Sequence, residues 1–153
     1  MRRPLLLLAF AALLTACSSD PVKKRVWPPQ ASLQEVAVQD DGQWRLNLRL
    51  QNFSTVAMRY DQLDLRLEVA GIEAGRLSLR PGISVGPGSA EIVEALLTPA
   101  DAAREPMDAV LRTRNGLRYR LVGRIVSGDP RGNYDIEFAS ALNPVPGLDG
   151  VLR

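Results

Sequence analysis

Hydrophobic and polar residues alternate along much of the chain after residue 31. Apolar side chains take every second position in residues 44–50, and residues 63–69 repeat the pattern. Such alternation is typical of strands with one buried and one solvated face. We therefore predict that these two strands direct the following side chains into a core: Trp44, Leu46, Leu48, Leu50, Leu63, Leu65, Leu67 and Val69.

Weaker alternation predicts further strands at residues 33–38, 76–80, 90–97, 117–125 and 134–138. In residues 90–97 the expected inward side chains are Ile92 and, less regularly, Val93, Leu96 and Leu97. About seven strands of this kind, with turn residues between them, indicate an all-β fold, an antiparallel β-sandwich.

One short helix is predicted after the strand at residues 90–97. Thr98 is a suitable cap, Pro99 fits the first helical position and Asp101 completes a capping box. Pro106 is expected to interrupt or restart the helix. Gly71 and Gly75 are expected to bracket a turn.

The first residues of the chain have the pattern of a secretory signal. Met1-Arg2-Arg3 is positively charged, and residues 5–14 form an apolar run of roughly ten residues. A membrane span needs about twenty apolar residues, so the run favours a signal over a transmembrane anchor. Leu14, Thr15 and Ala16 then precede Cys17.

The sequence Leu14-Thr15-Ala16-Cys17 resembles the lipobox of bacterial lipoproteins. The resemblance implies that residues 1–16 are removed, that the Cys17 thiol is diacylated and that the new amine is acylated. It places the chain on the periplasmic side of the cell envelope. Ser18 after the cysteine resembles the outer-membrane class rather than the inner-membrane class. An exported protein with a spare thiol is the alternative.

Residues 17–30 are expected to form a lipidated tether. They contain Lys23-Lys24-Arg25 and then Trp27-Pro28-Pro29. The prolines disfavour a helix and stiffen an extended segment. The basic triplet either lies on anionic headgroups or belongs to a solvated linker. Trp27 either anchors at the interface or packs on the domain.

Charge and composition exclude several functions. The chain has 19 basic and 17 acidic residues, and loss of Arg2 and Arg3 with the signal would leave 17 of each. This balance gives no support for nucleic-acid binding. Histidine is absent and Cys17 is the only cysteine. The usual metal ligands and the usual base for a nucleophile are therefore missing, so we expect no enzyme, metal site, cofactor or evident small-molecule substrate.

Several motifs resemble the group 2 late embryogenesis abundant family, also called the WHy (water stress and hypersensitive response) domain. Residues 65–71 fit its aliphatic-x-aliphatic-x-Val-x-Gly strand, and residues 119–123 fit its Tyr-x-Leu-x-Gly motif. Asn52-Phe53-Ser54 corresponds to its Asn-Pro-Asn turn, with Phe53 and Ser54 as departures.

The resemblance covers roughly residues 31–139. We expect residues 31–140 to form the sandwich domain and residues 141–153 an irregular tail. It implies a fibronectin type III-like sandwich that protects against desiccation or other stress. The family supplies no catalytic residues. From the residues themselves, Asn52 is interpreted as a structural turn residue rather than a ligand.

The densest basic cluster offers a possible anion site. Arg118, Arg120 and Arg124 are expected to share the outward face of one strand, where guanidinium groups could hold phosphates. The alternative is that they pair with acids on an adjacent strand, such as Asp135 and Glu137. Nothing points a pair of carboxylates into a cleft.

Two functional hypotheses follow. The first is a lipid-anchored, stress-protective sandwich without catalytic activity. The second is an envelope module that binds a protein partner through a sheet edge.

Overall fold

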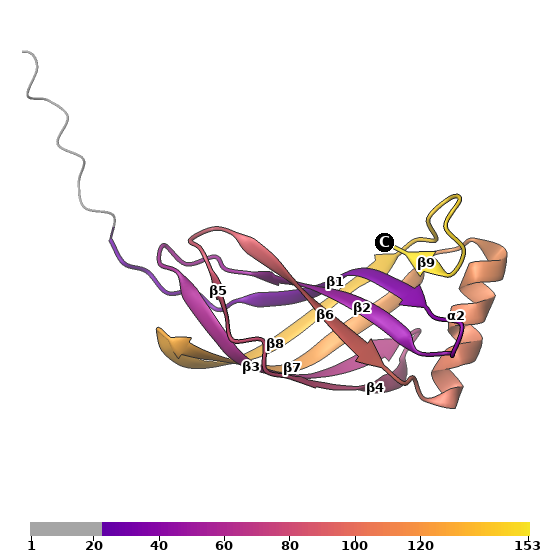
Figure 1. Ribbon diagram of the computed structural model, residues 1–153, viewed down its shortest axis with the longest axis horizontal. Helices are drawn as coiled ribbons and strands as arrows, with labels where there is room; N and C mark the ends of the chain where they lie inside the picture. Colours follow the sequence, from indigo (N-terminus) through magenta and orange to yellow (C-terminus); the bar gives the residue numbers. More distant parts are fainter. Residues whose placement is uncertain (1–22) are drawn as a thin grey trace, which may run out of the picture.

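A computed structural model describes residues 23–153, and within this range the chain forms nine strands and one helix (Figure 1). The lipobox residues Leu14, Thr15, Ala16 and Cys17 lie outside the described residues. The predicted lipidation therefore stays a prediction.

The first sheet contains four antiparallel strands in the order β6-β2-β1-β9. The alternating residues 44–50 form its β2 strand, as predicted, and their apolar side chains are at most 1% exposed. Its strands are β1 (Gln30–Val38), β2 (Trp44–Gln51), β6 (Ala90–Leu97) and β9 (Val151–Leu152).

The second sheet has the order β4-β3-β7-β8, with the short β5 paired to the beginning of β3. Its neighbouring strands are antiparallel. Its strands are β3 (Met58–Val69), β4 (Ile72–Leu79), β5 (Ile83–Val85), β7 (Leu117–Asp129) and β8 (Arg131–Leu142).

The inward faces of the two sheets form one core. Leu48 of β2, Leu67 of β3 and Leu121 of β7 are fully buried in the same cluster. Tyr119 joins the sheets, because its hydroxyl accepts a hydrogen bond of 3.1 Å from the Leu33 N–H, where β1 has a bulge. The predicted antiparallel sandwich with one short helix is confirmed within the described residues.

The structure has two short strands that the pattern did not predict. β5 has three residues and β9 has two, too few to show an alternation. The tail expected to be irregular therefore contributes β9, which pairs with β1. The turn between β3 and β4 uses Gly71 at φ +80°, whereas Gly75 lies inside β4 and does not bracket the turn.

The helix α2 (Asp101–Thr113) begins differently from the prediction. Its N-cap is Ala100, and no side chain caps it. The Ala100 N–H donates a 2.8 Å hydrogen bond to the Ala74 carbonyl, which holds residue 100 extended beside β4 and delays the first helical turn. Pro106 neither interrupts nor restarts the helix, which continues to Thr113.

β6 corrects the prediction for Ile92 and Leu96. Leu48 pairs with Val93, so Val93 shares the inward parity of β2, while Ile92 pairs with the exposed Arg49. Ile92 and Leu96 are consequently 45% and 62% exposed. Apolar residues occur on both faces of this strand, so the sequence pattern does not indicate which face is buried.

The ends of the sandwich differ. α2 and the C-terminus lie at one end, and residues 23–29 enter at the other (Figure 1). In the part of the chain that the structure describes, no helix is long and apolar enough to cross a membrane.

Candidate functional site

The side chain of Asn52 organises the connection between β2 and β3. Its amide nitrogen lies 2.8–3.0 Å from three backbone carbonyl oxygens, those of Val56, Val85 and Gly86. Its amide oxygen accepts a 2.8 Å hydrogen bond from the Ser54 N–H. Asn52 is fully buried. The interpretation of Asn52 as a structural turn residue agrees with this geometry, and we call residues 52–56 the Asn52 turn.

The incoming chain binds to this turn. The Trp27 N–H donates a 2.8 Å hydrogen bond to the Ser54 hydroxyl. The Arg25 N–H donates to the Thr55 hydroxyl at 2.8 Å, and the Thr55 N–H donates back to the Arg25 carbonyl at 2.9 Å. Residues 25–27 therefore lie against the domain, whereas the sequence predicted a tether up to residue 30.

Phe53 lies between the two buried residues of the turn but points outward. It is 52% exposed, while Asn52 and Ser54 are at most 2% exposed. Residues 52–54, which we compared with a family turn from the sequence alone, thus divide into two that hold the loop and one that leaves a phenyl ring on the surface.

The arginines considered as an anion site lie on the outer face of the second sheet. Arg120 contacts Glu137 at 2.8 Å and Glu68 at 3.4 Å, and Arg124 contacts Asp135 at 2.9 Å. The alternative interpretation, pairing with acids on β8, is therefore what the structure has for Arg120 and Arg124. Arg118 is exposed and makes no ion pair with residues 23–153.

Hydrogen bonds to Glu137 and Glu68 raise the pKa of Arg120 above its ordinary value. The two carboxylates face the same guanidinium from β8 and β3, so an added anion at Arg120 would compete with both.

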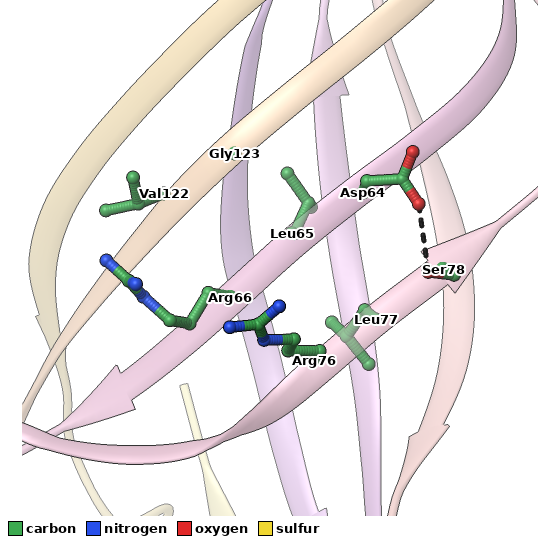
Figure 2. A pocket seen from close by; sticks show the side chains of 8 residues that line it. All are labelled: Asp64, Leu65, Arg66, Arg76, Leu77, Ser78, Val122 and Gly123. Atoms are coloured by element: carbon green, nitrogen blue, oxygen red, sulfur yellow. Dashed lines mark hydrogen bonds between the residues drawn. The ribbon is translucent and has the colours of Figure 1, made fainter.

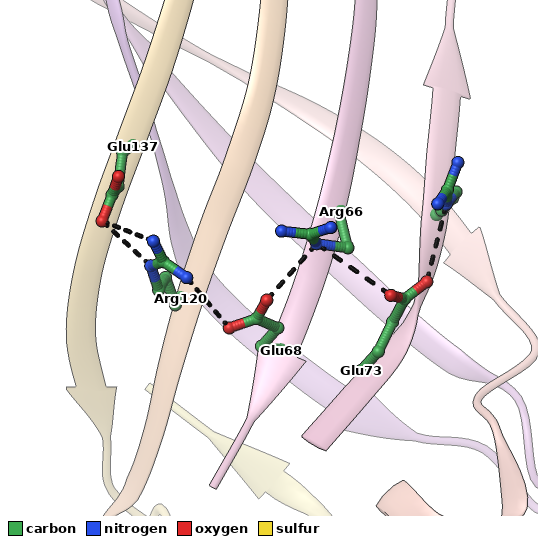
Figure 3. Close-up of polar contacts among 6 residues, drawn as sticks. Arg66, Glu68, Glu73, Arg120 and Glu137 are labelled. Carbon is green, nitrogen blue, oxygen red and sulfur yellow. Dashed lines mark hydrogen bonds and ion pairs between the residues drawn. The ribbon is translucent and has the colours of Figure 1, made fainter. Parts of the chain in front are cut away.

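The contacts of Arg120 belong to a longer row of alternating charges that crosses all four strands of the β4-β3-β7-β8 path (Figure 3). Beyond Glu68 the row continues through Arg66 at 3.3 Å, Glu73 at 4.0 Å and Arg76 at 3.5 Å. We call this set the charge ladder, in order Glu137, Arg120, Glu68, Arg66, Glu73 and Arg76.

The side chains in the middle of the ladder are less exposed than those at its ends. The side chain of Glu68 is 20% exposed, compared with 61% for Glu137 and 76% for Arg76. Arg66 Nε is buried and makes no hydrogen bond within the described residues, so its contact with Glu68 is an ion pair without hydrogen-bond alignment.

Beside the ladder the same face has a shallow hollow of about 360 Å³ (Figure 2). It lies over Gly123, where β7 passes so close to β3 that a Cβ would collide with the Asp64 carbonyl oxygen. Asp64 at its rim accepts hydrogen bonds from Ser78 at 2.9 Å and Gln62 at 2.6 Å. In residues 23–153 no group of acidic, histidine or cysteine residues has the arrangement of a metal site.

Comparisons with known proteins bear on the fold. No protein-family model and no curated protein matches the chain. It is similar to the solution structure of an Arabidopsis thaliana protein, with 15% identity and a TM-score of 0.57, over 78% of this chain and 83% of that one. This similarity shows a shared fold.

Two further structures match less well. A protein from Archaeoglobus fulgidus has 15% identity and a TM-score of 0.43, over 79% of this chain and 98% of that one. A structural genomics target has 11% identity and a TM-score of 0.43, over 81% of this chain and 92% of that one.

Sequence reasoning missed two features of these surfaces. The binding of residues 25–27 to the Asn52 turn joins positions about thirty apart and has no periodic signal. The charge ladder had a partial signal, because Arg66, Glu68 and Arg120 all have outward parity. Their meeting depends on β3 lying beside β7, which the order of strands along the chain does not give.

Proposed function

We propose that this chain is a lipid-anchored, non-enzymatic β-sandwich of the bacterial envelope that protects neighbouring proteins as water is lost. Cys17 would carry the lipid, and the domain would lie on the periplasmic side, at the outer membrane. No cofactor or metal takes part. The charge ladder is the observation that carries the protective part of the proposal.

The physical argument concerns charges in a drying environment. An exposed charge without a partner depends on water, and removal of water leaves it poorly solvated. A charge that already contacts its opposite is solvated by the protein, and the attraction grows as the effective dielectric constant falls. Each inner member of the ladder has an opposite charge within 4.0 Å on both sides. This face would keep its charge contacts on drying, so the domain would stay folded as a polar spacer.

A drying assay tests the function. Residues 18–153, which contain every core residue, would be dried and rehydrated with a labile client enzyme. An inert folded protein at equal mass is the control. We expect recovery of client activity clearly above that control. Recovery equal to the control would contradict the protective function.

A variant tests the mechanism separately. The double change R66Q/R120Q removes two cations of the ladder, and R45Q/R49Q removes two exposed arginines of β2 that make no ion pair with the described residues. We expect R66Q/R120Q to fold in water but to recover less native circular dichroism after drying than R45Q/R49Q. Equal recovery would contradict the role of the ladder while leaving the function open to the first assay.

A second candidate function is supported by β6. This strand is an edge of the first sheet, and its outer face exposes Ile92 and Leu96. An edge strand with exposed apolar side chains can accept a strand of another protein. The chain would then be an envelope module that binds a protein partner.

Crosslinking distinguishes this candidate. A photoreactive residue at Leu96 would be compared with one at Ala139, an exposed position of the other sheet's edge strand β8. One discrete adduct from position 96 and none from position 139 supports a partner at β6. Adducts from both positions, or from neither, would contradict it.

A further inference from the structure

The end of the sandwich at which the chain enters exposes an unusual set of apolar side chains. Trp27 and Phe53 are each 52% exposed, and Val26 is 44% exposed. The segment of residues 23–29 and the connection between β2 and β3, which carry these residues, lie at the end opposite α2 (Figure 1). Tryptophan and phenylalanine have large apolar surfaces, so a pair of them left in water at one place indicates an interaction surface.

Hydrogen bonds with the Ser54 hydroxyl hold the backbone of Trp27. The Ser54 hydroxyl accepts from the Trp27 N–H at 2.8 Å, and Ser54 itself is 2% exposed. Pro29, two positions after Trp27, is buried, whereas Pro28 is exposed. Trp27 and Phe53 therefore flank one buried anchor and present their rings from a fixed backbone.

The same surface is basic. Lys23, Lys24 and Arg25 are consecutive and exposed, and none of them makes an ion pair with residues 23–153. The charge ladder, by contrast, has its arginines paired. The charges of the triplet are thus available to an external anion.

Aromatic rings beside unpaired cations suit the interface of an anionic bilayer. Tryptophan is enriched at the level of the headgroups, and each Lys or Arg near an anionic leaflet adds attraction. We propose that Lys23, Lys24, Arg25, Trp27 and Phe53, here named the entry surface, bind the headgroup region of an anionic bilayer. The domain is then held with α2 directed away from the membrane.

The length of the preceding chain supports this partner. Lys23 follows Cys17 by six positions. Six residues span at most about 20 Å even when fully extended. This step rests on the proposed lipid anchor, which would keep the entry surface within reach of headgroups. Binding through the surface itself needs no acyl chain and is testable without one.

The experiment uses residues 18–153 and lipid vesicles. One set is pure phosphatidylcholine, and the other contains about 30% phosphatidylglycerol as the anionic lipid. We expect co-sedimentation at least about tenfold stronger with the anionic vesicles, and its loss in high salt. No binding to anionic vesicles, or equal binding to both kinds, would overturn the proposal.

Tryptophan fluorescence reports the orientation. The chain has two tryptophans, and Trp44 is 1% exposed, so a change on adding vesicles comes from Trp27. We expect a blue shift and quenching by brominated lipids. Binding without either change would overturn the proposed role of Trp27.

Matched variants locate the surface. K23S/K24S/R25S and W27A/F53A should each reduce anionic binding by about tenfold or more. The control R112S/R114S at the helix end removes two exposed charges, and I92S/L96S on β6 removes two apolar side chains of similar fractional exposure. These controls should bind as the wild type does, and equal loss in them would overturn the assignment. The drying assay contains no membrane, so its failure and the failure of vesicle binding are separate results.

Discussion

Two polar networks hold this sandwich, and they differ in burial and in charge. The Asn52 turn is held by neutral hydrogen bonds of 2.8–3.0 Å around one fully buried amide. The charge ladder is ionic and partly exposed, with contacts from 2.8 to 4.0 Å. Because water can replace exposed contacts and cannot reach buried ones, the network without charge should matter more to stability.

The largest expected effect is that of Asn52→Ala. It removes the hydrogen bonds of the Asn52 amide to the Val56 and Val85 carbonyls and to the Ser54 N–H, while the Gly86 carbonyl keeps a 3.2 Å bond from the Ser89 N–H. Buried unpaired groups cost about 1–3 kcal/mol each, so we expect a loss of at least about 3 kcal/mol in the free energy of unfolding. Urea denaturation measures it.

The control is Asn47→Ala on the outer face of β2. Asn47 makes one side-chain hydrogen bond, a 3.4 Å contact with the partly exposed Glu35. This change should cost about 0.5 kcal/mol or less. Similar losses for the two variants would show that the Asn52 turn is not a stabilising centre.

The second effect is alkaline destabilisation at Tyr60, which is 0% exposed and whose hydroxyl lies 3.5 Å from the carbonyl oxygen of Gln51, the residue before the Asn52 turn. Burial raises the pKa of Tyr60 to about 12 from the ordinary 10.0. The unfolded chain releases this proton near pH 10 and the folded chain keeps it until about pH 12, so stability present below pH 10 falls as the pH rises between these values.

The expected loss at Tyr60 is up to roughly 2 kcal/mol near pH 12. Urea denaturation at rising pH should show a shallower decline for Tyr60→Phe than for the wild type. Burial also raises the pKa of Tyr119, so the variant keeps part of the decline. If stability declined equally steeply with pH in the variant and the wild type, the buried region would tolerate the charge of ionised Tyr60. That result would contradict the expectation that burial makes the region near the Asn52 turn more sensitive than the charge ladder.

The third effect is that of Ser54→Ala. The change removes the acceptor of the Trp27 N–H but leaves the bonds of Asn52 in place, so we expect a loss of about 1 kcal/mol. Trypsin should also cut faster at Lys24 and Arg25, because residues 25–27 lose one of their attachments. Ser78→Ala, an exposed serine of β4, is the control, and equal cleavage rates would contradict the attachment.

The sequence predicts the fold best where one parity is wholly apolar. Strand β2 and residues 63–69 of β3 meet that condition, and their buried faces are as predicted. β6 has apolar residues at both parities, and β5 and β9, with three and two residues, are too short to show an alternation. Only the register with a neighbouring strand decides these elements.

The candidate sites divide in a similar way. Contacts between residues close together in the sequence could be predicted, and contacts that depend on distant strands could not. The pairing of Arg120 with Glu137 is predictable, since a hairpin brings β7 and β8 together. The Asn52 turn is predictable at its own residues, where the amide bonds the Ser54 N–H. Its bonds to residues 85 and 86 depend on β5 joining β3, and no local pattern signals them.

The smallest expected effect is that of Arg120→Gln in the ladder. The side chain of Arg120 is 41% exposed, so water replaces much of what its carboxylate partners supply. A double-mutant cycle with Glu137→Gln should give a coupling smaller than the losses at Asn52 and Ser54, and high salt should reduce it. A coupling as large as the loss at Asn52 would reverse the order of the two networks. A small coupling in water together with a clear loss after drying would mean that the ladder stabilises the domain mainly when water is scarce.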